Sequence, residues 1–430
     1  MTESRRVLVV GQGAREHALA WKLTRDGAEV LVAPGNAGTA AMAENVPVPA
    51  GDVPALVALA RDRRVDLAVI GPEAPLVAGV VDAFRAAGLR AFGPTAAAAR
   101  LEGSKSFCKQ ILHRGDVPTA MYRVFNGAAR ARDYVEARED MPMVVKADGL
   151  AAGKGVFVCD GREAALEALA ALGSDPQFAA AAGSILIEER LDGVEVSVMA
   201  ITDGRTIVTL PPLQDHKAAY DDDAGPNTGG MGAYCPAAFV DADLMAEIEA
   251  RILVPTVHAM RRAKVPFVGV LYAGLMLTAQ GPKVLEYNVR FGDPECQVLM
   301  LRLKSDALDL LEATARGTLK TAKPEFSDEV ALTVVLAAKG YPVSPETGSE
   351  IRGLNGQDDD KLMVFHAGTL RRDGKLIANG GRVLNVTALG RTVGEARDRA
   401  YAEVDRIEWP EGFCRRDIGW RAVERELKPA

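Results

Sequence analysis

The sequence predicts a multidomain protein of the α/β and α+β classes whose N-terminal domain is a doubly wound parallel sheet. Its 430 residues exceed one ordinary hydrophobic core and suit two to four packed domains. Hydrophobic residues make up 48% of the chain and charged residues 25%, which is the balance of a globular enzyme. Residues 1–102 alternate short β-branched runs with Ala-rich helical patterns, and this alternation is typical of parallel strands joined by helices.

The N-terminal region contains four predicted strands and three predicted helices. The strands are expected at residues 7–10, 29–32, 65–70 and 89–92, and the helices at residues 15–23, 54–60 and 76–86. Gly93-Pro94 closes the last of these strands, because this dipeptide favours a turn.

The pattern changes near Ser104 and again near residue 327. Ser104 predicts the N-cap of a helix that runs to residue 112. Strands are predicted at residues 143–147, 155–159, 184–189 and 194–202, followed by a hairpin that pairs 268–278 with 283–288. The last region reads as strands at 330–338, 362–366, 375–378 and 382–387 and an amphipathic helix at 393–407. These changes divide the chain into residues 1–102, 103–326 and 327–430.

Charge and cysteine content exclude several classes of protein. Fifty-one basic and 58 acidic residues give a net charge of −7, which disfavours binding along a nucleic-acid backbone. Five scattered cysteines without a C-x-x-C pair argue against a disulfide framework or a zinc site and for a reducing compartment. No apolar run approaches the roughly 18 residues of a membrane span, and the N-terminus lacks the pattern of a signal peptide. We therefore expect a cytoplasmic protein with no membrane partner.

The first glycine-rich loop follows the first predicted strand and opens a helix. Gly11 and Gly13 in this position indicate a phosphate site at a helix N-terminus, with simple close packing as the alternative. A dinucleotide fingerprint would need a glycine where Glu16 stands and an acid at the end of the second strand. An NAD-dependent dehydrogenase is therefore disfavoured.

Two further loops end the second and third predicted strands. Asn36, Gly38 and Thr39 lie in the first of them, and Glu73 opens the second. The carboxyl ends of parallel strands form the ligand-binding edge of open α/β sheets. These loops predict a pocket for a small anionic molecule, and ordinary Gly- and Pro-rich turns are the alternative.

A second glycine-rich loop lies between the predicted strands 143–147 and 155–159. It contains Gly149, Gly153, Lys154 and Gly155, and Lys146 precedes it on the strand. The glycine spacing is one residue short of a Walker A loop, and no Ser or Thr stands where that motif binds magnesium. A hairpin tip of this kind can fold its amides over phosphates while Lys146 directs its charge at the same oxygens. A plain flexible hairpin is the alternative.

The segment 285–290 carries three polar side chains at alternate positions. Glu286, Asn288 and Arg290 would share one face of a strand, while Tyr287 and Val289 point the other way. Carboxylate and amide oxygens suit a magnesium ion that bridges nucleotide phosphates, and a guanidinium suits a carboxylate or phosphate. A polar face directed at water is the alternative.

Residues 214–232 are polar and glycine-rich and show no periodicity. They contain Asp215 and Lys217 and, further on, Asn227 and Gly229. We predict a long structureless loop with a functional role in anion binding, because such loops in compact domains are usually functional. An isolated His216 is more often structural.

Together these residues make the chain resemble the glycinamide ribonucleotide synthetase family nearly end to end. The matching segments include residues 11–19, 33–39, 71–81, 146–155, 214–217, 225–234, 269–297, 364–369, 380–390 and 415–419. The resemblance implies an ATP-grasp domain at 103–326 with a mobile lid at about 119–190. It also implies an N-terminal substrate-binding domain at 1–102 and a small C-terminal α/β domain at 327–430 that closes the cleft.

The resemblance also implies roles for individual residues. The phosphates of ATP would meet Lys105, Lys146 and the loop of Gly149, Gly153, Lys154 and Gly155. Adenine would meet the backbone of 187–191, including Glu188 and Leu191, and ribose would meet Glu195. Mg²⁺ or Mn²⁺ would be held by Glu286 and Asn288. Glycine would be held by Asp215 and Arg290, which with Lys146 would form the catalytic set. Phosphoribosylamine would meet Gly13, Asn36, Gly38, Thr39, Glu73, Lys217, Asn227 and Gly229.

Four positions depart from the family pattern. Ala14, Ala218 and Asp222 stand where glycine, arginine and glycine are frequent, and they affect expected loop geometry rather than metal or ATP contacts. Gly274 stands where many ATP-grasp relatives carry a further acidic metal ligand, so water or another acid would complete the metal shell.

The resemblance implies a ligase that joins glycine to phosphoribosylamine through a glycyl phosphate intermediate, with ATP as substrate. Its partners would be small molecules alone, and a monomer is expected. Other ATP-grasp ligases and an inactive nucleotide-binding scaffold are the alternatives. The scaffold predicts loss of Lys146, Glu286 or Asn288, and all three are present.

Overall fold

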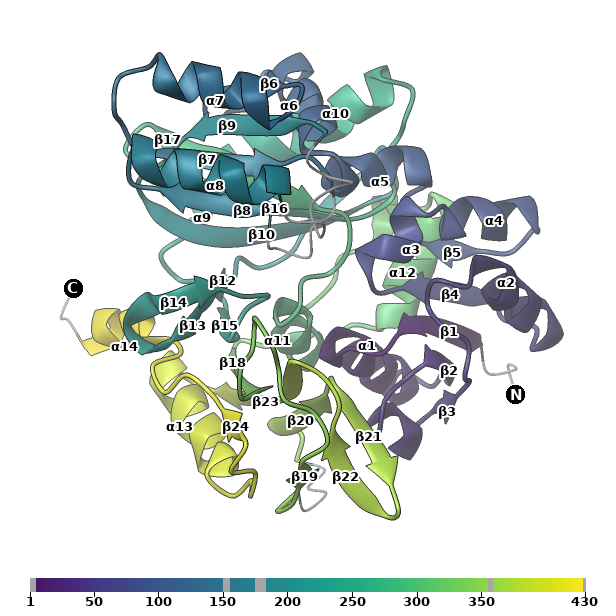
Figure 1. Ribbon diagram of the computed structural model, residues 1–430. Helices are drawn as coiled ribbons and strands as arrows, with labels where there is room; N and C mark the ends of the chain where they lie inside the picture. Colours follow the sequence, from purple (N-terminus) through teal and green to yellow (C-terminus); the bar gives the residue numbers. More distant parts are fainter. Residues whose placement is uncertain (1–4, 150–154, 175–182, 355–358, 428–430) are drawn as a thin grey trace.

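The structure is a computed structural model that describes residues 5–149, 155–174, 183–354 and 359–427. Its elements form an N-terminal parallel sheet, two antiparallel sheets stacked in the middle of the chain, and a C-terminal group of antiparallel strands (Figure 1). Within the described residues, no helix is both long enough and apolar enough for a membrane span.

The N-terminal sheet has the order β3-β2-β1-β4-β5, and every neighbouring pair is parallel. Its strands are β1 (Arg6–Gly11), β2 (Glu29–Pro34), β3 (Glu44–Asn45), β4 (Leu67–Ile70) and β5 (Ala91–Phe92). The helices are α1 (Ala14–Arg25), η1 (Thr39–Ala41), α2 (Val53–Asp62), α3 (Glu73–Val77), α4 (Val80–Ala86) and α5 (Ala96–Gly103). The strand order reverses on either side of β1, as in doubly wound folds, and the prediction for this domain is confirmed.

The single helix predicted over residues 76–86 is wrong. The structure has two helices there, α3 and α4, separated by Gly79. Gly79 adopts the left-handed conformation with φ 89°, which ends one helix and starts the next. The apolar period continues across the break, so the sequence pattern alone did not reveal it.

The first central sheet, here called the lid sheet, has the order β6-β9-β7-β8 and is antiparallel. Its strands are β6 (Tyr122–Phe125), β7 (Met143–Ala147), β8 (Val156–Cys159) and β9 (Ile185–Glu189). Helices α7 (Ala128–Glu136) and α8 (Arg162–Ser174) cover one face with a separate apolar core. Because side chains alternate, Lys146 and Glu188 lie on the opposite face.

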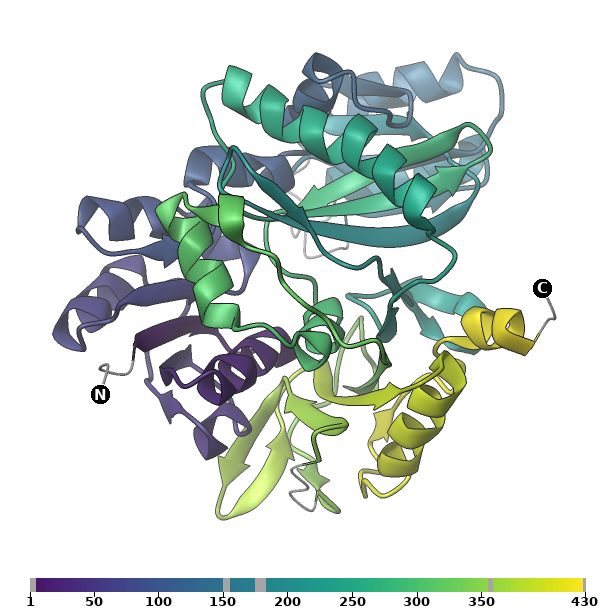
Figure 2. The same ribbon diagram turned by 180° about the vertical axis from the view of Figure 1, so that it is seen from behind.

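The second central sheet has the order β11-β10-β16-β17. Its strands are β10 (Val194–Thr202), β11 (Ile207–Thr209), β16 (Gly269–Thr278) and β17 (Gly281–Asn288). The predicted hairpin of 268–278 with 283–288 is confirmed as β16 and β17. The helices packed on this part are α6 (Lys105–Arg114), α9 (Ala242–Ile248), η4 (Glu249–Leu253) and α10 (Val254–Arg262), visible from behind in Figure 2.

The segment 214–232, predicted to be a structureless loop, forms strands instead. These are β12 (Gln214–Asp215), the hairpin of β13 (Ala218–Tyr220) and β14 (Ala224–Asn227) around η3 (Asp221–Asp223), and β15 (Gly232–Cys235). The prediction failed because strands of two to four residues leave no readable alternation.

β12 and β15 join a sheet with C-terminal strands, in the order β12-β15-β18-β23-β20. The C-terminal strands are β18 (Val330–Ala338), β19 (Glu350–Ile351), β20 (Leu362–His366), β21 (Thr369–Arg372), β22 (Lys375–Ala378), β23 (Arg382–Gly390) and β24 (Gly412–Phe413). β19, β22 and β21 form a separate three-stranded sheet. Helices α13 (Val393–Val404) and α14 (Trp420–Leu427) complete this part.

Two helices link the central sheets to the C-terminal strands. They are α11 (Glu295–Arg302) and α12 (Ala307–Arg316), followed by the short turn η5 (Leu319–Thr321). α11 packs on α1 and also contacts β18 and β23, and α12 packs on β5 (Figure 1). The three parts of the chain therefore meet around α11, directly after the strand that carries Glu286.

Candidate active site

Strand β17 presents the predicted alternation. Tyr287 and Val289 are buried, whereas Glu286 is exposed on the opposite face and Asn288 is half-buried. Gly274 lies opposite Glu286 in the register of β16 and β17. A Cβ atom at Gly274 would lie 3.5 Å from Cγ of Glu286, so an acidic residue at that position would stand directly beside this carboxylate.

Arg290 connects the central sheets to the N-terminal domain. Its guanidinium lies 3.0 Å from Glu102 and 3.3 Å from Glu73, and it donates a 3.0 Å hydrogen bond to Oδ1 of Asn288. Burial opposes the guanidinium charge, but Glu102 and Glu73 outweigh it and hold the pKa of Arg290 above its ordinary value. Burial raises the pKa of Glu102. Sequence analysis did not identify Glu102, which lies in the last turn of the Ala-rich helix α5 and belongs to no motif.

The two lysines predicted to bind phosphate, Lys105 and Lys146, lie where the lid sheet approaches α6 and β17. Nζ of Lys105 donates to the carbonyl of Gly149 at 3.0 Å, so the lysine contacts the start of the predicted phosphate loop. Nζ of Lys146 lies 2.9 Å from Oε2 of Glu188 and 3.3 Å from the carbonyl of Leu285, next to Glu286. Burial lowers the pKa of Lys105. The structure thus places both predicted lysines beside the strand of the predicted metal ligands.

Other residues predicted for ATP are only partly described. Gly153 and Lys154 lie outside the described residues, whereas Gly155 immediately precedes β8. Leu191 is half-buried in the turn after β9, and Glu195 is exposed on β10.

A third lysine, Lys109 on α6, was missed by the sequence analysis. Its Nζ lies 3.2 Å from Oε1 of Glu188, so Glu188 is paired with two buried lysines. Lys109 falls on the buried face of an amphipathic helix, where a lysine stem is easily taken for part of a solvated edge.

Asp215 and Lys217 form a half-buried ion pair in the β12 segment. Nζ of Lys217 donates to Oδ2 of Asp215 at 2.5 Å. Burial opposes the ammonium charge, but Asp215 outweighs it and holds the pKa of Lys217 well above its ordinary value. Nearby, the hydroxyl of Tyr272 donates to Glu295 at 2.5 Å, and burial followed by the charge of Asp215 raises the pKa of Glu295. Sequence analysis assigned no role to Glu295 or Tyr272: Tyr272 lies in an apolar strand pattern, and Glu295 ends the turn of residues 291–295.

Arg382 brings the C-terminal strands to the same region. It donates to the carbonyls of Asp293 at 2.6 Å and Gly229 at 2.8 Å, and it lies 3.4 Å from the Asp293 carboxylate. The amide of Gly229 donates to the hydroxyl of Tyr341 at 3.1 Å. Asn227 is exposed at the end of β14. Gly229 is thus held on both sides by residues of the C-terminal part.

The loop after β2 uses most of its polar atoms internally. Oδ1 of Asn36 accepts from the amides of Gly38 and Thr39, and the Thr39 hydroxyl lies 3.0 Å from the Asn36 carbonyl oxygen and 2.8 Å from Oδ1 of Asn45, either of which can accept its proton. A Cβ atom at Gly38 would lie 2.3 Å from the ring of His17, so this glycine is required by close packing. Asn36 and Thr39 therefore shape the loop with their side chains.

The amide of Gly13 is not a free phosphate donor. It donates to Oε2 of Glu16 at 2.5 Å, and the Glu16 side chain fills the space beside Gly11, Gly13 and Gly71. Arg15 in turn pairs with Glu16 at 2.6 Å. In the structure a carboxylate of the helix itself occupies the position next to the Gly13 amide, and a role of Gly13 in substrate binding stays a prediction.

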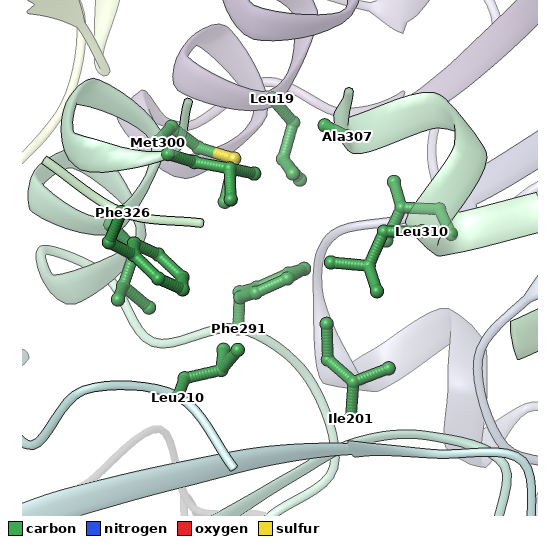
Figure 3. Close-up of a pocket in the computed structure, with 11 residues that line it drawn as sticks. Leu19, Ile201, Leu210, Phe291, Met300, Ala307, Leu310 and Phe326 are labelled. Atoms are coloured by element: carbon green, nitrogen blue, oxygen red, sulfur yellow. The ribbon is translucent and has the colours of Figure 1, made fainter. Parts of the chain in front are cut away.

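An apolar pocket lies beneath Phe291, next to Arg290 (Figure 3). All of its lining residues are apolar, and they come from α1, β10, α11, α12 and the connecting segments: Leu19, Ile201, Leu210, Phe291, Leu299, Met300, Leu303, Ala307, Leu310, Leu311 and Phe326. It offers nothing to a charged substrate. Its lining side chains, which include Phe291 next to Arg290, pack together residues of the N-terminal and central parts.

Glu286 is the residue best suited to a metal ion. Within the described part of the chain its carboxylate has no hydrogen-bond or ion-pair partner, which leaves its oxygens available as hard ligands. Oδ1 of Asn288 accepts from Arg290 and retains a second lone pair. No group of three or more His, Cys, Asp or Glu side chains in the described ranges is arranged to bind a metal alone. The residues present fit an ion that takes its remaining oxygens from phosphate and water.

Family models match nearly the whole chain. Their descriptions and ranges are the N domain of phosphoribosylglycinamide synthetase at residues 5–102, its ATP-grasp (A) domain at 103–296 and its C domain at 331–421.

Individual proteins agree with the family models. The chain is 54% identical to a phosphoribosylamine–glycine ligase of Rhodopirellula baltica, over 97% of this chain and 98% of the relative. A crystal structure of phosphoribosylamine–glycine ligase from Thermotoga maritima matches with a TM-score of 0.84 and 35% identity, covering 96% of this chain and all of the other. A biotin carboxylase from Campylobacter jejuni matches with a TM-score of 0.73, 14% identity and coverage of 96% and 93%, which shows a shared fold alone.

Proposed function

This chain belongs to the phosphoribosylglycinamide synthetase family, and we propose that it joins glycine to 5-phosphoribosylamine with ATP to form glycinamide ribonucleotide, ADP and phosphate. The observation that carries the proposal is the end of β17. There the carboxylate of Glu286 has no partner within the described residues. Four residues later, the guanidinium of Arg290 forms an ion pair with Glu73 of the N-terminal domain. A phosphate-activating site therefore adjoins a second substrate site.

ATP would lie between the lid sheet and β17. Lys105 and Lys146 would bind its phosphates, together with the loop that contains Gly149, Gly153, Lys154 and Gly155. The backbone from Glu188 to Leu191 would face adenine, and Glu195 would accept hydrogen bonds from ribose. Two lysines would draw charge from the γ-phosphate as it is transferred.

Glu286 and Asn288 would hold Mg²⁺ or Mn²⁺. When bound, the ion supplies charge neutralisation at the phosphate oxygens and helps to align the reacting groups.

Glycine would be held by Asp215 through its ammonium and by Arg290 through its carboxylate. A glycine carboxylate oxygen attacks the γ-phosphorus of ATP, the bond to the β-phosphate oxygen breaks, and glycyl phosphate and ADP form. Arg290 suits this task because its charge is secured by Glu102 and Glu73, which leaves its position defined before substrate arrives.

Phosphoribosylamine would lie against the N-terminal loops, close to Glu73 and Lys217. The loop of Asn36, Gly38 and Thr39, the turn at Gly13, and the segment of Asn227 and Gly229 would form its walls. Its amine nitrogen attacks the glycyl carbonyl carbon and loses a proton, and phosphate leaves. The ammonium of Lys217 would bind the 5′-phosphate.

The test is ATP-dependent phosphate release in the presence of glycine, magnesium and phosphoribosylamine made in situ from ribose 5-phosphate and ammonia. We expect turnover that requires every component, with glycinamide ribonucleotide detected by mass. ATP binding without this product would direct attention to another amine acceptor. Failure to bind ATP would overturn the proposal.

A further inference from the structure

Glu188 is shared by two lysines in the interior of the protein. Oε2 lies 2.9 Å from Nζ of Lys146, and Oε1 lies 3.2 Å from Nζ of Lys109. The three side chains are 2–8% exposed. With one carboxylate and two ammonium groups, this triad carries one excess positive charge in a buried site, and burial lowers the pKa of Lys109. An excess buried cation of this kind favours the arrival of an anion.

The two lysines have different surroundings. Lys146 stands on β7, and its second acceptor is the carbonyl of Leu285, beside the metal-ligand strand. Lys109 stands on α6, outside the lid sheet, and donates to the Thr119 hydroxyl at 2.7 Å. Lys146 is therefore directed toward the nucleotide site, while Lys109 is anchored away from it.

Lys109 also connects α6 to the beginning of the lid sheet. Its ammonium lies 5.3 Å from the ring centre of Tyr122 on β6. The hydroxyl of Thr119 in turn donates a 2.7 Å hydrogen bond to the carbonyl of Val284 on β17. Lys109 thus has three partners in the lid segment that contains Thr119, Tyr122 and Glu188, although its own helix lies outside that segment.

We propose that Lys109 is a positioning residue of the nucleotide site, which remains with Glu188 as its counter-ion when Lys146 turns to the phosphates of ATP. Lys146 is paired with Glu188 in the structure and would leave it to bind phosphate. A carboxylate that loses its only cation in a buried site is strongly destabilised, because it has neither water nor a partner. With Lys109 in place, Glu188 keeps one cation, and Lys146 is available to the nucleotide.

The direct test is Lys109→Met, which keeps most of the apolar stem and removes the charge. The affinity for magnesium–ATP, measured by calorimetry, should weaken on the order of tenfold or more, since one member of a buried ion pair is lost. The KM for glycine should change by less than about twofold, because Asp215 and Arg290 lie elsewhere. Lys109→Arg should restore most of the affinity. Arg114→Met is the matched control, since it removes an exposed cation from the same helix and should leave ATP affinity unchanged.

A second variant separates positioning from structural damage. In Lys109→Met with Glu188→Gln, no buried carboxylate needs a counter-ion, so Lys146 is free again and ATP affinity should recover relative to Lys109→Met alone. Damage to packing alone would instead make the double variant bind ATP as weakly as the single variant or more weakly, and would overturn the proposal. Unchanged ATP affinity in Lys109→Met would overturn it as well.

The inference rests on the proposed function only in placing ATP phosphates beside Lys146. Calorimetry needs neither phosphoribosylamine nor turnover. A wild-type chain that binds ATP without forming glycinamide ribonucleotide would contradict the proposed function, and the affinities of the variants would still decide the role of Lys109.

Discussion

Arg290 illustrates how single residues carry the site. Its guanidinium reaches Glu73, Glu102 and Asn288, which come from three separate stretches of the chain. A cation that is buried among two carboxylates and an amide has little freedom left to lose when a substrate carboxylate arrives. Glu286 lies four residues earlier on the same face. Within the described residues its carboxylate has no ion-pair partner, and the side chain is exposed.

This contrast predicts the effect of Glu286→Gln. Turnover should fall by roughly a hundredfold or more, because the change removes the carboxylate that we propose binds the metal ion. The melting temperature should stay close to that of the wild type, since Glu286 is exposed and makes no ion pair within the described chain. Glu424→Gln, an equally exposed carboxylate on α14, serves as the control. Unchanged turnover with Glu286→Gln would exclude the metal role.

His216 predicts a pH dependence of stability. Burial, followed by the charge of Arg415, lowers its pKa from 6.5 to about 4, and its Nε2 accepts from the amide of Gly419 at 3.1 Å. Between these two pKa values the unfolded chain binds the proton and the folded chain does not. The stability that neutral His216 contributes is therefore complete above pH 6.5 and is lost as the pH falls toward 4.

The measurement is the free energy of unfolding by urea at pH 7 and pH 5. His216 should account for a slope of up to about 1.4 kcal/mol per pH unit, and His216→Gln should remove that part of the slope. His258→Gln, which alters an exposed histidine, should leave the slope as it is. An identical slope in His216→Gln and the wild type would contradict the prediction.

Among the helices and strands, the spacing of apolar residues predicts which element forms, and a single glycine can determine where a helix ends. From Glu286 to Arg290 polar and buried side chains alternate, so one face holds the polar side chains and the other packs into the core, whereas a register shift at Leu285 breaks the alternation earlier in β17. Gly79 divides what the apolar pattern presents as one helix into α3 and α4. The break brings Glu73 to the first turn of a short helix that faces Arg290.

Gly79→Ala should therefore destabilise the protein by about 1–2 kcal/mol, the cost of a left-handed backbone for a residue with a Cβ atom. The atoms nearest to a Cβ there are 3.6 Å away or more, so no steric clash adds to this cost. Denaturant unfolding measures the difference. Gly51→Ala, at a position without positive φ and without close neighbours, should change stability by less than about 0.5 kcal/mol. Equal effects of the two substitutions would contradict the assignment.

In the molecule as a whole, the C-terminal strands contact residues predicted to bind substrate. β12 and β15 join β18 and β23 in one sheet, so the segment of Asp215 is built into the C-terminal core. Arg382 on β23 then binds the carbonyls of Asp293 and Gly229. On the N-terminal side, the amide of His366 donates to Nδ1 of His17 at 2.8 Å. The C-terminal part thus contacts both of the others.

Arg382→Met should raise the KM for phosphoribosylamine on the order of tenfold, because charge-assisted hydrogen bonds that position Gly229 and Asp293 are lost. The KM for ATP should change by less than about twofold, since Arg382 contacts Gly229 and Asp293 and none of the residues proposed to bind ATP. Steady-state kinetics with each substrate varied in turn provide the measurement. Arg372→Met removes an exposed cation of β21 and should alter neither constant. A rise in both KM values would mean that Arg382 supports the fold in general.

The local features of this protein can be predicted from neighbouring residues in the sequence. The strand and helix alternation of residues 1–102 predicted the doubly wound sheet, and the two-residue period of 285–290 predicted which side chains β17 presents. The helix cap at Ser104 and the hairpin of β16 and β17 also followed from near neighbours in the chain. These features are local because side-chain direction in a helix or strand depends on residues only a few positions away.

The ion pairs between residues far apart in the chain could be seen only in the folded structure. Arg290 and Glu73 are 217 positions apart, and Lys109 pairs with Glu188 across two different elements. The two-residue strand β12 has too few side chains to show a period, so its place beside the C-terminal strands was hidden in the sequence. Pairings of this kind depend on how complete sheets and helices pack, and the free energy that selects them comes from burying their apolar faces together rather than from any local pattern.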